Sequence, residues 1–484
     1  MAESEVRVTG AGISEPTATI EVAGGSASEN VVGENADHSW CLDAFTVALN
    51  AACDEKHWYV STINLQLASL QFCIACRNVK TLHVQIDSNA AWRRGHLSRA
   101  EGATPEADCS GAYTGAATRV PTLRPRGVTW LSRNMPQADD IELLAGIEFF
   151  TFGDQFHGEV AGVVLPQGLK EVKFGDRFNT TIEGVSWPAS LIRLTFGSEF
   201  NQPIHTLPPA LEHLTFGYMF NQPLDRVIWP SSILELTIGE TFNQALVGVP
   251  LPGSLQTLIL GRWCTQALDG VQWPASLQRL TLGDRFNSRI DNVAWPGLLQ
   301  HLSFGERFNQ PVHNVVWPAS LLTMIFGYDF NRAIDEVTWP ESLQHLTFGA
   351  CFDMAIDKVA WPPSLEELHF GYEFNQPTNG ITWPASLVLL TLAEMFNQPL
   401  QGATVLPASL EEFILKVDRS HYSHSLAGVE WPATLRKLIV SDIAGLDALE
   451  LPAGASLLVS GQRRPHEDVA SSWLQNNSFI LGAS

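Results

Sequence analysis

The chain has 484 residues, of which 45% are hydrophobic and 10% aromatic, and its formal net charge is −22 at pH 7. Such an acidic balance disfavours binding to nucleic-acid phosphates and to anionic membrane surfaces. No run of 18 apolar residues occurs, so the sequence predicts no transmembrane helix.

Residues 1–36 are rich in Gly, Ser, Ala and Glu and contain no aromatic residue. This composition is typical of a disordered tail. The segment also lacks a basic stretch followed by an apolar one, so it predicts no secretory signal. We therefore expect an intracellular, cytoplasmic protein.

Residues 37–98 predict a small module of mixed or α/β structure, whose fold the sequence does not define. Its first apolar run, with Trp40, Leu42 and Phe45, is compatible with a helix, and residues 79–86 alternate like a strand. Residues 99–140 turn to Gly, Ala, Thr, Pro and Arg, which indicates a linker.

Most of the cysteines precede residue 110. Cys73-x-x-Cys76, with Cys53 and His57 nearby, has the ligand types of a zinc site. A second close cysteine pair is missing, however, and this favours buried free thiols. We therefore predict no metal ion and no cofactor.

Residues 141–460 are organised by a phrase that returns about every 22 residues. A fixed period of this size is typical of a solenoid. We predict a mostly β, leucine-rich-repeat-like solenoid of about 14 coils with one short parallel strand in each. Trp-Pro or Leu-Pro pairs mark the coils, with prolines at 166, 188, 208, 230, 252, 274, 296, 318, 340, 362, 384, 407, 432 and 452.

Counted from the Trp, one unit reads W-P-x-S-L-x-x-L-x-F-G-x-x-F-N-x-x-I-x-x-V-x. Positions 7 to 10 alternate with period two and predict a short strand with one face inward. Glycine at position 11 is expected to end the strand because it tolerates a positive φ. We expect the Phe at position 14 to stack in the core and the Asn at position 15 to form a polar ladder between coils.

The phrases Phe220-Asn221-Gln222-Pro223-Leu224, Phe308-Asn309-Gln310-Pro311 and Phe396-Asn397-Gln398-Pro399-Leu400 each follow L-x-x-L-x-[FL]-[GA]. They resemble the FNIP repeats, a 22-residue class related to leucine-rich repeats. The resemblance covers about residues 141–460, although Trp often precedes the proline here where the family more often has Leu. It implies a solenoid that binds protein, and it implies no catalytic residues.

The strand face is the predicted binding surface. Repeat residues are constant while the outward residues vary from coil to coil, as expected of a surface that recognises a partner. The alternative is a solvated sheet face with no partner. The predicted partner-binding residues are Glu171, Arg193, His213, Glu235, Arg279, His301, His345 and Glu367 at position 7, with Tyr218, Trp263, Tyr328 and Tyr372 just beyond the glycine.

No phosphate-binding loop, nucleophile elbow or His-Glu zinc motif is present, so the predicted function is that of a non-enzymatic, monomeric scaffold for a protein partner. The acidic charge is compatible with a basic partner. A second hypothesis is an adaptor or substrate receptor of a ubiquitin-ligase-type complex, with residues 37–98 recruiting another component. A third is an ice-binding lattice formed by the threonines at position 9, which Lys173 and several other residues interrupt.

Two segments depart from the repeat near the C-terminus. His421-x-x-His424, with Asp418 and Tyr422, lies where the expected G-x-x-F-N is missing, and it is interpreted as a solvated insertion or a functional loop. Residues 461–484 predict a polar helical cap for the end of the solenoid.

Overall fold

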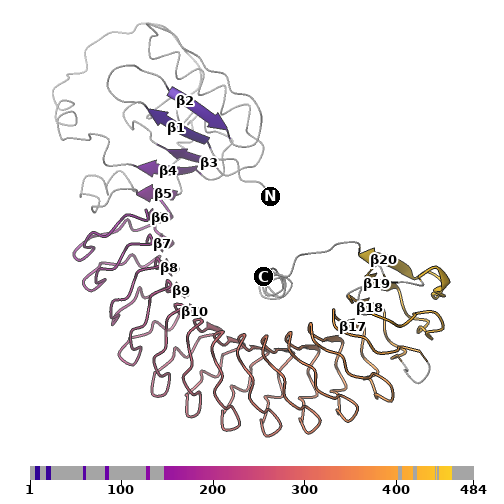
Figure 1. Ribbon diagram of the computed structural model, residues 1–484. Helices are drawn as coiled ribbons and strands as arrows, with labels where there is room; N and C mark the ends of the chain where they lie inside the picture. The colour runs from indigo at the N-terminus through magenta and orange to yellow at the C-terminus, as the bar shows by residue number, and fades with distance from the viewer. Residues whose placement is uncertain are drawn as a thin grey trace, which may run out of the picture. The chain divides into compact units, whose positions relative to one another are not determined.

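The computed structural model describes residues 146–401, 406–417, 422–441, 443 and 446–460, together with the backbone of five strands nearer the N-terminus. The chain divides into two compact units, and many of their strands are labelled in Figure 1. Unit 1 comprises Met1–Gln202 and Thr206–Gly217, and unit 2 comprises Pro203–His205 and Tyr218–Ser484.

Unit 1 is a parallel ladder with one antiparallel strand pair at its start. β1 pairs with β2 in antiparallel fashion and with β3 in parallel, and β3 to β9 then pair in parallel and in chain order. The strands are β1 (Val6–Gly10), β2 (Ala18–Val22), β3 (Trp58–Ser61), β4 (Leu82–Ile86), β5 (Gly127–Trp130), β6 (Phe149–Phe152), β7 (Glu171–Lys173), β8 (Arg193–Thr195) and β9 (His213–Thr215).

The expected strand within residues 79–86 is confirmed by β4. β1 and β2 lie in the range for which the sequence predicts a disordered tail, and β5 lies in the range predicted as a linker. The predicted helix near Trp40, the proposed zinc ligands and the predicted cap at 461–484 fall outside the described residues. The domain boundaries therefore stay a prediction.

Unit 2 consists of parallel strands that pair in chain order from β10 to β20. They are β10 (Glu235–Thr237), β11 (Thr257–Ile259), β12 (Arg279–Thr281), β13 (His301–Ser303), β14 (Thr323–Ile325), β15 (His345–Thr347), β16 (Glu367–His369), β17 (Leu389–Leu392), β18 (Glu412–Leu415), β19 (Lys437–Ser441) and β20 (Ser456–Ser460). A single 3₁₀ turn, Leu446–Ala448, lies among the described residues between β19 and β20. Each unit thus contains the predicted stack of short parallel strands.

Most complete coils have three tight turns, and none has an α-helix within the described residues. In one coil the N–H groups of Leu321, Phe330 and Val337 donate to the carbonyls of Pro318, Gly327 and Ile334 at 3.2, 3.2 and 3.3 Å. Since these turns recur at the same repeat positions, they leave room for one short strand per 22 residues, as the sequence predicts.

The predicted Phe column is confirmed. In unit 2 the rings of Phe308, Phe330 and Phe352 stack at centroid separations of 6.1 Å, and all three are buried. Position-10 rings, such as Phe326 and Phe348, lie 5.6 Å apart, and paired strands lie about 4.8 Å apart. Neighbouring coils therefore splay apart away from the strand, which lies on the inside of this local bend.

The Asn ladder is confirmed as well. Asn309 Oδ1 accepts a hydrogen bond from the backbone N–H of Asn331 at 3.1 Å, and Asn331 Oδ1 accepts one from the N–H of Asp353 at 3.0 Å. Asp353 replaces Asn without breaking the column, since its N–H donates to Asn331 and its Oδ1 accepts a bond from the N–H of Asn375 at 2.9 Å. The N–H of Thr265 likewise donates to Asn243 Oδ1 at 3.0 Å. The side chain of one coil thus satisfies the main chain of the next.

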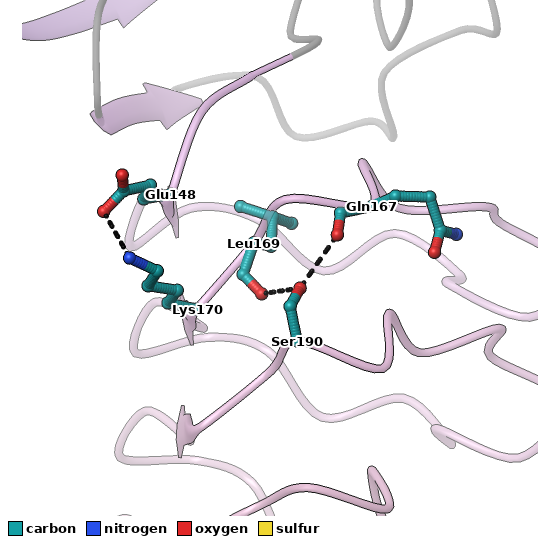
Figure 2. A network of polar contacts seen from close by, with 5 residues as sticks. All are labelled: Glu148, Gln167, Leu169, Lys170 and Ser190. Atoms are coloured by element: carbon teal, nitrogen blue, oxygen red, sulfur yellow. Dashed lines mark hydrogen bonds and ion pairs between the residues drawn. The ribbon is translucent and has the colours of Figure 1, made fainter.

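A serine ladder at position 4, which the sequence analysis did not identify, also links the coils. The hydroxyl of Ser190 lies 2.6 Å from the carbonyl oxygen of Leu169 and 2.9 Å from that of Gln167, both in the preceding coil, and Figure 2 marks these two contacts. The hydroxyl donates to these acceptors, and Ser320 and Ser342 repeat the contact at 2.7 Å in unit 2. The recurrent Ser in W-P-x-S-L was the available signal.

The reason given for glycine at position 11 is wrong. The glycines with positive φ are at another place, for example Gly184, Gly270 and Gly380 in the turn before the next Trp-Pro. Position 11 instead favours glycine because the coils approach closely there, although Ala393 takes this place in one coil. A Cβ on Gly327 would lie 1.7 Å from the carbonyl oxygen of Gly305.

Candidate functional site

The candidate site is the outward face of the strands. Positions 8 and 10 are buried from β6 to β19, and positions 7 and 9 point the other way because side chains alternate along a strand. The register aligns position 7 from strand to strand. Arg279 lies opposite His301 and His345 lies opposite Glu367, with Thr323 of β14 between the two histidines.

The structure therefore places the predicted position-7 residues in two rows, one in each unit. Their side chains are exposed or partly exposed. The row of unit 1 holds Glu171, Arg193 and His213, and the row of unit 2 holds Glu235, Arg279, His301, His345 and Glu367.

The predicted aromatic residues lie beyond the strand ends and not within these rows. Tyr218 is 48% exposed and Trp263 40% exposed, whereas Tyr328 and Tyr372 are partly buried. The guanidinium of Arg285 covers one face of the Trp263 ring at 3.6 Å from its centroid, a cation–π contact. Trp263 therefore presents only its other face to a partner.

The strongest electrostatic cluster of the strand face joins β15 and β16. Glu367 Oε2 lies 3.0 Å from His345 Nδ1 and 3.7 Å from His369 Nε2. These hydrogen bonds hold the pKa of Glu367 well below its usual range, and the carboxylate in turn raises the pKa of His345. His369 Nδ1 lies 2.9 Å from the Thr391 hydroxyl. Glu367 is thus already paired with two imidazole groups.

His301 behaves in the opposite way. Burial, together with the charges of Arg279 and His345, lowers its pKa to about 4. A small hollow of about 20 Å³ lies beside it, lined by residues of β12, β13 and β14 that include Arg279, His301 and Ile325. This volume accommodates about one water molecule or one end of a small polar group.

The chemistry of the described residues offers no activated nucleophile. Burial raises the pKa of Cys264, and burial with nearby carboxylates raises that of Cys351 to about 11, so both are protonated thiols at neutral pH. In the part of the chain that the structure describes, no cluster of three or more His, Cys, Asp or Glu is placed to hold a metal ion. Cys53, Cys73, Cys76 and His57 lie outside that part.

The segment around His424 continues the repeat. The backbone N–H of Ser423 donates to Asn397 Oδ1 at 2.9 Å, and His424 Nε2 lies 3.2 Å from the Asn397 carbonyl. Tyr422 is buried, and burial raises its pKa to about 12. Tyr422, Ser423 and His424 thus replace the Phe-Asn-Gln of other coils, so His424 has a structural role. Asp418 and His421 lie outside the described residues.

Short parallel strands, stacked aromatic residues and an asparagine ladder define the class of protein, a leucine-rich-repeat-like solenoid. The family model described as FNIP Repeat matches residues 156–199, 178–219, 200–241, 308–351 and 330–373. The chain therefore contains FNIP repeats within residues 156–241 and 308–373.

Among solved structures the chain is similar to CroV588, described as a novel circular LRR protein structure, with 33% identity and a TM-score of 0.61. The match covers 69% of this chain and 53% of CroV588, so the chain spans about half the length of that protein. Another match is an internalin (inlF) from Listeria monocytogenes str. 4b F2365, with 12% identity and a TM-score of 0.39, covering 70% of this chain and 87% of the internalin. No curated protein matches the chain.

Within the described residues, no helix has the length and apolar character needed to cross a membrane.

Proposed function

We propose that the chain is a non-enzymatic scaffold that binds a protein partner through the strand face of its solenoid. The register at position 7 carries this proposal. Framework residues recur in every coil, while successive strands present different side chains at this position, for example Arg279, His301 and Thr323. A surface that is constant in geometry and variable in chemistry is suited to selecting one partner.

Two further observations support this function. Leucine-rich-repeat solenoids generally mediate protein–protein interaction, and this chain has their architecture and FNIP repeats. The surface also offers Arg, Tyr and Trp, the residue types that dominate binding energy at protein interfaces. The protonated thiols and the small hollow on the strand face favour binding over catalysis.

Site-specific photo-crosslinking in cells tests the proposal. A benzophenone amino acid is introduced in the full chain at Glu171 or Arg279 on the strand face, and in a control at Val316. Val316 is 82% exposed but lies on the arc that leads to the next Trp-Pro. We expect a discrete protein adduct from at least one strand-face position and none from Val316. Adducts that form only at Val316, or equally at all three positions, would contradict the proposal.

A further inference from the structure

The strand face of unit 2 contains a stretch without carboxylates. The outward residues of β11 to β15, at repeat positions 7 and 9, comprise one arginine, two histidines and otherwise uncharged side chains. We call this stretch the basic window. It consists of Thr257, Ile259, Arg279, Thr281, His301, Ser303, Thr323, Ile325, His345 and Thr347. The whole chain has a net charge of −22, whereas the basic window contains no acidic residue.

Three acidic groups near the basic window are already engaged. Glu367 on β16 pairs with His345 and His369. Beyond the strand ends, Asp284 and Glu306 lie 3.2 and 3.9 Å from the guanidinium of Arg262. These carboxylates are therefore partly neutralised by neighbouring cations.

Arg279 and His301 form the centre of the window. They lie directly opposite each other on β12 and β13, which run about 4.8 Å apart. Within the described part of the chain, neither side chain makes a hydrogen bond or an ion pair. Both line the hollow whose wall includes Ile325, a residue only 3% exposed. The donor groups of Arg279 and His301, which are not used among the described residues, thus lie beside the buried apolar side chain of Ile325.

We propose that the basic window binds an acidic segment of the protein partner, with one carboxylate held between Arg279 and His301. The inference rests on the proposed function, since it assigns a chemistry to the partner on the same strand face. A carboxylate has two oxygens that each accept a hydrogen bond, so donors on neighbouring strands can share it. Hydrogen bonds to an ionised carboxylate are charge-assisted, and they are about twice as strong as hydrogen bonds between neutral groups.

The charges on either side favour a short acidic peptide over other ligands. A basic peptide would find no carboxylate in the window and would bring its cations against Arg279. A long polyanion would extend beyond the window to Glu235 on β10 and to Glu366 and Glu367 at β16. A peptide with one or two carboxylates fits within the window, where it avoids repulsion between cations and Arg279 and repulsion between its carboxylates and the flanking glutamates.

Binding should take up a proton. A bound carboxylate favours the imidazolium form of His301, whose pKa in the free protein is held at about 4 by burial, Arg279 and His345. Because binding raises the pKa of His301, the affinity for the acidic segment should increase as the pH falls toward the raised pKa. His345, which faces Glu367 and Glu366, also becomes cationic as pH falls and acts in the same direction.

Fluorescence anisotropy with the full chain tests this inference. The probe is a labelled octapeptide of threonine with two glutamates at its centre, and the comparison peptides replace both glutamates by lysine or by glutamine. We expect only the acidic peptide to bind, more tightly at pH 5.5 than at pH 7.5 and more weakly at high salt. Arg279→Gln should weaken binding about tenfold or more.

Arg226→Gln is the control, because the side chain of Arg226 is 82% exposed and lies on the arc that leads to the next Trp-Pro, away from the strand face. It should leave binding unchanged, and circular dichroism should show that both variants are folded. The inference is overturned when the acidic peptide does not bind at millimolar concentration, when the lysine peptide binds as tightly, or when the two arginine variants behave alike. Strand-face crosslinks that persist in any of these cases would keep the proposed function and reject only the acidic partner.

Discussion

Glycines at different repeat positions should respond very differently to the same substitution. Gly327 at position 11 has a backbone neighbour that a methyl group would strike, the carbonyl oxygen of Gly305 at 1.7 Å. Gly297 at position 3 has no atom within 4 Å and no positive φ. Alanine occupies position 3 in several other coils, for example at Ala319 and Ala385.

The magnitude follows from the contacts that hold the two coils together. A carbon and a carbonyl oxygen normally stay about 3.3 Å apart or more, so Gly327→Ala must separate the coils locally. The bonds at risk run from Phe304 N–H to the Ile325 carbonyl at 2.9 Å and from Asp329 N–H to the Glu306 carbonyl at 2.7 Å. With about 1 kcal/mol for each bond and about 2 kcal/mol for overpacking, the expected loss is about 4 kcal/mol.

Gly297→Ala should be neutral or should stabilise by up to about 1 kcal/mol, because it only restricts the unfolded chain. Gly380→Ala should lie between these values at about 1–2 kcal/mol, since φ is +78° there but space is free. Urea denaturation followed by circular dichroism and tryptophan fluorescence ranks the three variants. Equal unfolding midpoints for Gly327→Ala and Gly297→Ala would refute the close-approach argument.

Three further predictions concern the columns and the charged cluster. Phe330→Ala should cost about 3–5 kcal/mol in denaturation experiments, and a loss below about 1 kcal/mol would contradict the stacked core. Asn309→Ala leaves the N–H of Asn331 without its acceptor and should cost about 1–3 kcal/mol; Asn309→Asp, which keeps an oxygen there, should cost much less. The pKa of His345 is raised, so its contribution to stability is complete below about pH 6.5 and disappears as the pH rises through the raised pKa. The pKa of Glu367 is lowered, so its contribution to stability is complete above about pH 4.5 and disappears as the pH falls through the lowered pKa. His345→Gln should therefore destabilise most between about pH 4.5 and about pH 6.5, by about 0.5 kcal/mol because the pair is partly exposed, and a uniform loss across pH would show that the ion pair is not the cause.

Much of the fold was predictable because each coil interacts mainly with its neighbours. A repeated residue therefore implies a repeated contact, which is why Phe330 and Asn331 could be assigned to a core column and a ladder from the sequence alone. The same repeat also predicted which side chains of each strand point outward. The position-7 residues could be placed on one surface, although nothing in a repeat reveals which partner that surface binds.

Other features were hidden because one residue type serves more than one physical need. Glycine is used for positive φ at Gly380 and for close packing at Gly327, and only coordinates distinguish the two. The segment near His424 was obscured by its extra residues, which hide the equivalence of Tyr422 to the core phenylalanines until the Ser423 bond to Asn397 is seen.

The tryptophans before proline illustrate a third limit of prediction from the sequence. Their indole N–H groups are buried without a hydrogen-bond partner in the described chain, for example in Trp317 and Trp339. Buried indoles usually find one. Here the rings stack on each other, as Trp295 and Trp317 do at 6.1 Å, so Trp acts as a large apolar residue. This explains why Leu251 can take the same place.

The separation of framework from surface has a consequence for recognition. Arg279 belongs to none of the columns of Phe, Asn, Ser or Gly, and its side chain makes no bond within the described residues. In a solenoid whose stability is a sum of coil and neighbour contributions, replacing such a residue should leave the unfolding midpoint within about 0.5 kcal/mol of the parent. Arg279→Gln should therefore lose partner binding without losing stability, measured by anisotropy and denaturation on the same sample. A large stability loss would mean that position 7 belongs to the framework, and the variation along the strand face would then need another explanation.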